Sequence, residues 1–285
     1  MKQIILIITT SIICYSCGSN SGAMDSSRHN IPENYVVLLD LSDRLINNPN
    51  QTDIDTTAIR TAFEKFEMAV KKQLVVKSKE IFSVRIIAQK GSDLPINNFE
   101  NNLTLNLGAY TAAEKLIKLN QFKNEFGKYL KMLYQQAFLG TKSENYFGVD
   151  IWQYFNEQIN TDIKEGYKNQ ILVLTDGYFD FEDKTRGLNS GNQSTITRHL
   201  ISQLRDVNWK EKAEKSNVGI IPVKIKSNVR FIIAGIQSKS DDLMETSKLS
   251  YLWSKWIQQS GAKIACNPII NASSGKIKNI IMDNL

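Results

Sequence analysis

The chain has 285 residues, enough for one large α/β domain or two small ones. Its composition, 42% apolar and 22% charged, is ordinary for a globular protein. The formal charge is +6, but the basic residues are scattered among acidic ones and no basic run alternates with aromatics. This pattern argues against nucleic acid as a partner.

The N-terminus has the features of a secretory signal. Residues 4–13 are mostly apolar, and this run is too short to span a bilayer as a helix. It ends in CYSCGSN, which resembles the lipobox of bacterial lipoproteins, where a small residue precedes the cysteine that receives lipid. Ser16 precedes Cys17, whereas the bulky Ile13 precedes Cys14, so Cys17 is the expected lipidation site. A plain secretory signal cut nearby is the alternative.

These features predict a signal peptide over residues 1–16 and a flexible tether over residues 17–34, which is rich in Ser, Gly and Asn. Acyl chains such as palmitate on Cys17 would hold the protein on a membrane of the bacterial cell envelope, facing the periplasm or the outside. Cys266 would then have no partner for an intrachain disulfide, and its apolar surroundings favour a buried, inert thiol.

The main domain begins with an apolar run, residues 36–39, which indicates a strand buried on both faces. Strands and helices alternate from there. The expected helices cover residues 52–72, 111–138, 151–163, 195–215 and 241–259, and the further strands cover 82–88, 103–107, 171–175, 219–225, 229–236 and 263–266. This order predicts one α/β domain over residues 35–271, with a doubly wound, mostly parallel sheet between two layers of helices, and a C-terminal tail over 272–285.

Two of the buried strands end in a carboxylate. YVVLLDLSDR places Asp40 after the first strand, and ILVLTDG places Asp176 after a later one, with Gly177 allowing a tight turn. Ligands of open α/β sheets gather outside the carboxyl ends of the strands, so both aspartates are expected at one edge. Tyr178 and Phe181 follow on a segment that is expected to be extended and exposed. Their side chains could belong to a surface that binds a partner, or they could pack in the core.

These motifs resemble a von Willebrand factor type A (vWA) domain, which carries D-x-S-x-S after its first strand, a threonine in a later loop and T-D-G after its fourth strand. The resemblance covers residues 35–271. It implies a metal-ion-dependent adhesion site in which Asp40, Ser42 and Asp176 bind Mg²⁺. In that family a carboxylate of a protein partner often completes the metal shell. The C-terminal helix with Trp253 and Trp256 also resembles some bacterial lipoproteins of this type.

The chain departs from the family pattern at two positions. Arg44 stands where the second serine is expected, and Val149 where the threonine is expected. Mg²⁺ demands about six oxygen ligands, so a site that has lost two hydroxyls should bind it weakly or not at all.

Three arrangements of this degenerate site are open. The guanidinium of Arg44 could replace the ion as a counter-ion between Asp40 and Asp176. Asp43 or Asp150 could instead turn inward and restore the ligand count. Finally, Arg44 could point to solvent beside a vestigial site.

A metal-dependent hydrolase is the alternative class. Haloacid-dehalogenase-like phosphatases carry D-x-D-x-T after the first strand, and Asp241 and Asp242 could then be further metal ligands. Ser42 occupies the position of the second acid, so the proton donor is missing. Asp241 and Asp242 are better interpreted as the polar start of a helix. The sequence therefore favours a non-catalytic, lipid-anchored envelope protein that binds an unidentified protein partner at the Asp40/Asp176 edge.

Overall fold

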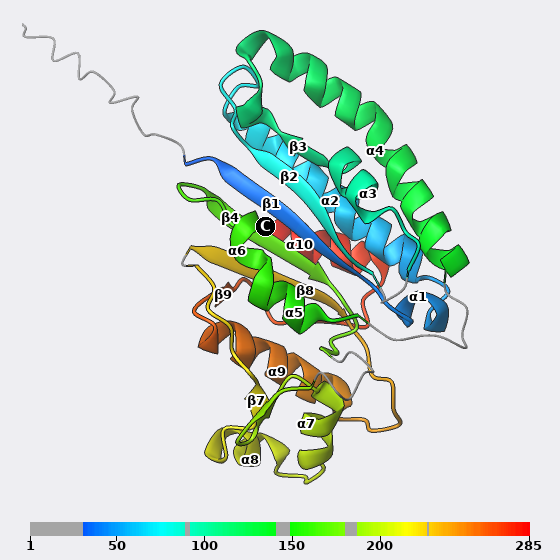
Figure 1. Cartoon of the computed structure of the whole chain (residues 1–285), viewed down its shortest axis with the longest axis vertical. Coiled ribbons are helices and arrows are strands. Elements are labelled where there is room, and N and C mark those ends of the chain that lie inside the picture. The colour runs from blue at the N-terminus through cyan, green and yellow to red at the C-terminus, as the bar shows by residue number, and fades with distance from the viewer. Residues whose placement is uncertain (1–30, 89–91, 141–148, 180–186, 227) are drawn as a thin grey trace, which may run out of the picture. The chain divides into compact units, whose positions relative to one another are not determined.

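Strand β1 (Glu33–Leu41) lies inside a sheet with the order β10-β8-β4-β1-β2-β3, and β9 also pairs with β8 (Figure 1). Its neighbours β2 (Ile81–Ala88) and β4 (Lys168–Leu174) both run parallel to it, and β8 (Val229–Ile236) runs parallel to β4. The computed structural model describes residues 31–88, 92–140, 149–179, 187–226 and 228–285, and residues 31–285 form one compact unit. The predicted signal peptide, Cys17 and most of the tether lie outside the described residues.

The remaining strands are short. β3 (Thr104–Asn106) is antiparallel to β2, while β9 (Lys263–Ile264) and β10 (Ile269–Ile270) are parallel to β8. A separate small sheet consists of β5 (Asn189–Ser190), β6 (Gln193–Ser194) and β7 (Gly219–Ile220). The predicted α/β class with a mostly parallel central sheet is confirmed. The strand expected over residues 219–225 is only two residues long and belongs to the small sheet.

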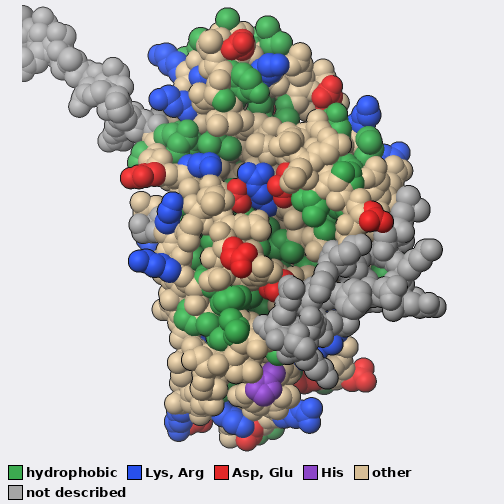
Figure 2. Space-filling view, in the orientation of Figure 1, with side chains coloured by type: hydrophobic (Ala, Val, Ile, Leu, Met, Phe, Trp, Pro, Cys, Tyr) green, Lys and Arg blue, Asp and Glu red, His purple; other side chains and the backbone are tan. Residues whose placement is uncertain are grey.

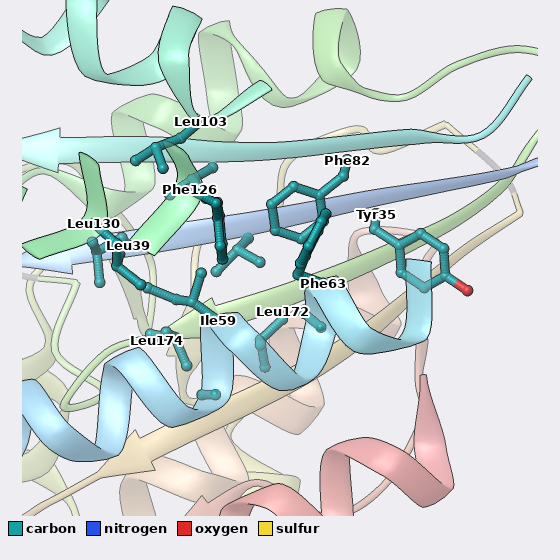
Figure 3. Packing of buried hydrophobic residues seen from close by; sticks show 14 of the residues in the cluster. Tyr35, Leu39, Ile59, Phe63, Phe82, Leu103, Phe126, Leu130, Leu172 and Leu174 are labelled. Carbon is teal, nitrogen blue, oxygen red and sulfur yellow. The ribbon is translucent and has the colours of Figure 1, made fainter. Parts of the chain in front are cut away.

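One face of the central sheet is covered by α2 (Gln51–Lys72), α4 (Ala112–Gly140) and α10 (Ser274–Asn284), with α3 (Ile96–Asn102) and the 3₁₀ turn η1 (Leu107–Ala109) at its edge. Side chains alternate along β1, so Tyr35, Val37 and Leu39 point to this face. Phenylalanine side chains pack together with leucine and isoleucine side chains between the sheet and these helices (Figure 3). The ring centres of Phe63 and Phe126, for example, are 4.8 Å apart.

The other face packs against α5 (Ile151–Glu157), α6 (Ile159–Asp162), α7 (Thr197–Gln203), α8 (Trp209–Lys215) and α9 (Glu245–Gln259). Val36 and Leu38 of β1 point this way. Trp253 and Trp256 of α9 are fully buried here, and the ring of Trp253 lies 4.2 Å from that of Phe179, centre to centre. The sheet is therefore covered on both sides, as a parallel sheet requires.

Several sequence expectations need correction. Tyr178 and Phe179 are buried against α9, so of the two possibilities the core packing applies to Tyr178. The ring of Trp253 packs on Phe179 and its Nε1 donates to Gly177 O at 2.9 Å, while the Tyr178 hydroxyl donates to Glu245. Phe181 lies outside the described residues. The predicted helices over 151–163 and 195–215 each divide into two. The predicted tail over 272–285 forms α10, which is part of the domain: Ile277 and Ile281 are fully buried beside α2.

None of the helices in the described part of the chain is long and apolar enough to cross a membrane.

Candidate functional site at the carboxyl edge of the sheet

The parallel pairing of β1 and β4 brings Asp40 and Asp176 to the same edge of the sheet. Leu39 of β1 is in register with Leu174 of β4, so Asp40, the next residue of β1, and Asp176, two residues beyond Leu174, lie at the same edge. Thr175 connects the two strand ends by donating from its hydroxyl to Asp40 Oδ2 at 2.8 Å. Both aspartates are buried. The edge thus holds two carboxylates that are largely shielded from water.

Burial and the nearby charge of Asp176 raise the pKa of Asp40 to about 7, against the opposing effects of Arg44 and of the Ser42 and Thr175 hydroxyls. Ser42 is buried beside it. Asp40 Oδ1 and Ser42 Oγ have no hydrogen-bond partner among the described residues.

The side chain of Arg44 does not bridge Asp40 and Asp176, so that hypothesis is wrong. Arg44 opens the short helix α1 (Arg44–Asn47), and its side chain turns into the interior toward α2. Nε donates to Asp40 O at 2.9 Å, and a terminal nitrogen lies 2.5 Å from Asp55 Oδ2. Asp55 also accepts from Gln51 Nε2 at 2.8 Å. Burial alone would lower the pKa of Arg44, but Asp55 and then Asp40 raise it above its ordinary value. Arg44 is thus the counter-ion of Asp55.

Lys239 supplies the cation that contacts Asp176. It lies in the loop after β8, and its Nζ is 2.7 Å from Asp176 Oδ2 and 2.6 Å from Asp43 Oδ1. Nζ also lies 5.0 Å from the centre of the Tyr178 ring. Burial lowers the pKa of Lys239, but Asp176 and Asp43 more than compensate and raise it. The side chain of Asp43 therefore points inward, toward the site, as in the second of the three arrangements that the sequence leaves open. It contacts the ammonium group of Lys239 there.

A hydrogen-bond network holds the loop that carries Lys239. Gln237 N donates to Asp176 O at 3.0 Å, and Lys239 N donates to the Tyr178 hydroxyl at 3.0 Å. That hydroxyl donates in turn to Glu245 at the start of α9, which also accepts from Ser238 Oγ at 2.8 Å. Burial, followed by the Glu245 contact, raises the pKa of Tyr178. The network positions the ammonium group before any ligand arrives.

An open cavity of about 570 Å³ lies over these groups. Asp43, Arg44, Asp176 and Arg198 line it together with the loop of residues 237–241. Asp150 and Val149 are not among the lining residues. Asp150 begins α5 and accepts from Gln153 N at 2.8 Å, which makes it a helix cap. We refer below to the cavity and its lining residues as the rim site.

The rim site does not fit a divalent metal in this conformation. Asp40, Ser42 and Asp176 could offer oxygens, but the ammonium group of Lys239 already lies against Asp176 and would repel a second cation. Within the described residues there is no group of three or more His, Cys, Asp or Glu side chains arranged to hold a metal. A metal would have to displace Lys239 first.

The candidate ligands of the hydrolase alternative have separate positions. Asp241 lines the cavity, whereas Asp242 lies 2.5 Å from Lys248 Nζ and accepts from Met244 N at 2.9 Å. Asp242 thus lies just before α9 in the polar segment that the sequence predicts. Sequence patterns do not point to Lys239, because it belongs to no motif. The sequence offers one indication of its position: if β8 is parallel to β4, the two strands end at the same edge of the sheet, and Lys239 follows β8.

No protein-family model matches the chain, and no curated protein sequence matches it. Among solved structures it is similar to proximal thread matrix protein 1 from the mussel byssus, with a TM-score of 0.34, 11% identity, and coverage of 88% of this chain and 46% of that one. It is also similar to the pilus adhesin SpaC from Lactobacillus rhamnosus GG, with a TM-score of 0.41, 11% identity, and coverage of 88% and 29%. The chain spans less than half of the length of either protein, and similarity at this level does not define a family.

Proposed function

We propose that this is a lipid-anchored protein of the bacterial envelope whose vWA-like domain binds a protein partner at the rim site without catalysis. The observation that carries the proposal is the ammonium group of Lys239, held between Asp43 and Asp176 at 2.6 and 2.7 Å in an open cavity. In the vWA pattern a metal ion would meet the partner near these aspartates. Here a built-in cation takes that role.

The chemistry of the ammonium group suggests what the partner presents. A lysine ammonium has three N–H donors. Asp43 accepts one of them and the carboxylate of Asp176 lies within ion-pair distance, which leaves at least one donor for a ligand, and about a quarter of the side chain is exposed. A carboxylate of the partner, entering the cavity, would accept this hydrogen bond. A charge-assisted bond of this kind contributes about 1.5–3 kcal/mol.

The proposed class rests on the order of elements and on two motifs. D-L-S at the end of β1 and T-D-G after β4 bring Asp40, Ser42 and Asp176 to one edge of a helix-covered, mostly parallel sheet. Attachment to the envelope rests on the lipobox-like CYSCG at residues 14–18. Mass spectrometry of the membrane-extracted protein should find acyl chains on Cys17 and none in a Cys17→Ser variant.

Site-specific photo-crosslinking in cells tests partner binding. A photoreactive amino acid is placed at Ser240, beside the cavity, or as a control at Val207, which is 91% exposed on the α7–α8 loop. We expect an adduct from position 240 only, and its loss in Lys239→Met. The matched control is Lys278→Met, which removes a surface lysine paired with Glu64 at 3.2 Å. An adduct that survives Lys239→Met would contradict the proposal.

A phosphatase screen of the purified protein tests the hydrolase alternative. Turnover by the wild type that Asp40→Asn abolishes would replace the binding function by an enzymatic one. We expect no turnover that depends on Asp40, because Ser42 stands where that family needs its proton donor.

A further inference from the structure

A second surface lies at the opposite end of the sheet, where β1 begins. Asn34 of β1 is in register with Ile81 of β2, so the segment that precedes Ile81 lies beside the start of β1. That segment, residues 71–79, reads KKQLVVKSK and contains four lysines and no acidic residue. All four lysines are exposed. The left edge of the view in Figure 2, on the side where β1 begins in Figure 1, shows more basic than acidic side chains. We call Lys71, Lys72, Leu74, Val76, Lys77 and Lys79 the tether-end surface.

Two apolar side chains project from this surface. Leu74 is 59% and Val76 50% exposed, whereas Val75 between them packs against the core. Leu74 follows the last turn of α2 with φ of +62°, in the left-handed region where glycine or asparagine is usual after a helix. A leucine pays a steric penalty in that conformation and gains no burial from it. Its presence is therefore not explained by the stability of the fold.

The loop that displays these side chains is held in place. Ser78 N donates to Leu74 O at 3.0 Å, and Ser78 O accepts from the buried Lys115 Nζ of α4 at 2.7 Å. The same contact brings the start of α4 to this end of the domain, with Leu116 and Ile117 both more than half exposed. The apolar and basic groups thus form a fixed surface, since the loop is tied to α4 as well as to α2.

We propose that the tether-end surface docks on an anionic lipid bilayer. Its lysines match the charge of the headgroups, and Leu74 and Val76 would enter the boundary between headgroups and acyl chains. Each lysine close to an anionic leaflet strengthens binding about fivefold. The position of the tether-end surface in the domain also supports docking on a bilayer. The strand β1 begins beside this surface, and the predicted lipid-bearing segment precedes β1 in the chain.

Docking would determine how the rim site is presented. The tether-end surface and the rim site lie at opposite ends of β1, which has nine residues and therefore spans about 30 Å. A domain that rests on the membrane through its tether-end surface would hold the rim site away from the bilayer. In this respect the inference rests on the proposed function, whereas the docking itself does not depend on the rim site.

The test uses the full chain with Cys14, Cys17 and Cys266 changed to Ser and one cysteine introduced as Val76→Cys or, as a control, Val207→Cys. Each thiol carries a polarity-sensitive fluorophore. Quenching by acrylamide in the water phase is measured on phosphatidylcholine vesicles with and without phosphatidylglycerol. We expect several-fold protection at position 76 on anionic vesicles only, and none at position 207.

A charge variant and a backbone variant sharpen the test. Changing Lys71, Lys72, Lys77 and Lys79 to Gln should remove the protection at position 76 and weaken vesicle binding by nearly three orders of magnitude, about fivefold for each lysine. Leu74→Gly should reduce the protection of position 76 from quenching and should raise the melting temperature of the protein. A purely structural role for Leu74 would not produce these two changes together.

Other results would overturn the inference. Equal quenching at positions 76 and 207 on vesicle-bound chain, equal protection on uncharged vesicles, or protection that appears only with an added acidic protein would each do so. Lys239→Met should leave the protection unchanged. Wild-type protein that gives no crosslink at position 240, or one that survives Lys239→Met, while protection at position 76 is intact would therefore refute the proposed function alone. Normal rim crosslinking without protection at position 76 would refute only the docking.

Discussion

The ammonium group of Lys239 lies 2.7 Å from the carboxylate of Asp176, so a side chain from the loop after β8 neutralises a carboxylate at the end of β4. The contact joins two neighbouring parallel strands across the cavity. Because Lys239 also pairs with Asp43 at 2.6 Å, it ties together the ends of β1, β4 and β8. A cation of the chain itself therefore offsets part of the negative charge of the rim site.

Removing Lys239 should create affinity for a divalent cation. In Lys239→Met the carboxylates of Asp43 and Asp176 lose their counter-ion, and the oxygens of Asp40 and Ser42 lie beside them. We expect calorimetry to show Mg²⁺ or Mn²⁺ binding by this variant, and weak binding or none by the wild type and by Lys278→Met. Tight binding by the wild type, unchanged in Lys239→Met, would rule out the substitution of lysine for metal.

The buried pair of Arg44 and Asp55 should be costly to break from one side. Both side chains are about 1% exposed, so Arg44→Met would leave the Asp55 charge without its partner in the interior. Such a change destabilises a protein by about 3–5 kcal/mol. Urea unfolding should show this loss, and the double change Arg44→Met with Asp55→Leu should recover part of it. A single variant as stable as Lys278→Met, whose surface pair contributes about 0–1 kcal/mol, would contradict the prediction.

Asp40 should make the protein less stable as the pH rises toward 8. Its pKa is about 7 in the folded state against an ordinary 3.8, so the folded protein binds this proton more tightly than the unfolded chain. The stabilising contribution is complete below about pH 3.8 and is lost as the pH rises through about 7, with a slope of at most about 1.4 kcal/mol per pH unit. Urea unfolding at pH 5 and pH 8 should show that Asp40→Asn removes this part of the pH dependence. An identical pH dependence in both proteins would refute the prediction.

Gly235 should tolerate no side chain. It has φ of +97°, and an added Cβ would lie 2.9 Å from Thr175 O and 3.0 Å from a terminal nitrogen of Arg44. Gly191 is the matched control, because it also has a positive φ, of +59°, but an added Cβ there meets nothing within 4 Å. We expect Gly235→Ala to lower the melting temperature clearly more than Gly191→Ala. Equal shifts would mean that only the backbone conformation matters at these positions.

The central strands were predictable because β1 and β4 are buried on both faces and appear as unbroken apolar runs. The small sheet could not be predicted, since its two-residue strands are too short to show any periodicity. The sequence predicts an exposed segment at Tyr178 and Phe179, because polar and charged residues surround it, but it leaves core packing of Tyr178 open. Their burial depends on Trp253 of α9, a contact far along the chain.

The rim site was only partly predictable. Asp40, Ser42 and Asp176 lie at or just beyond the ends of strands that finish at one edge, so their proximity could be inferred from the parallel arrangement alone. The partner of Arg44 could not, because the turn of α1 sends its side chain toward Asp55 in α2. Lys239 carries no motif, and its position depends on the contacts of Tyr178 and Glu245 with its loop.

All four tryptophans belong to the half of the domain that contains α9. Trp209, Trp253 and Trp256 are buried there and Trp152 packs against the same cluster, while the half beneath α2 and α4 is filled by phenylalanines. Intrinsic fluorescence emission will therefore report on one side of the sheet only. If the two sides melt at different temperatures, emission and far-ultraviolet circular dichroism will give different midpoints, and the chain will act as its own spectroscopic probe of whether its two cores unfold together.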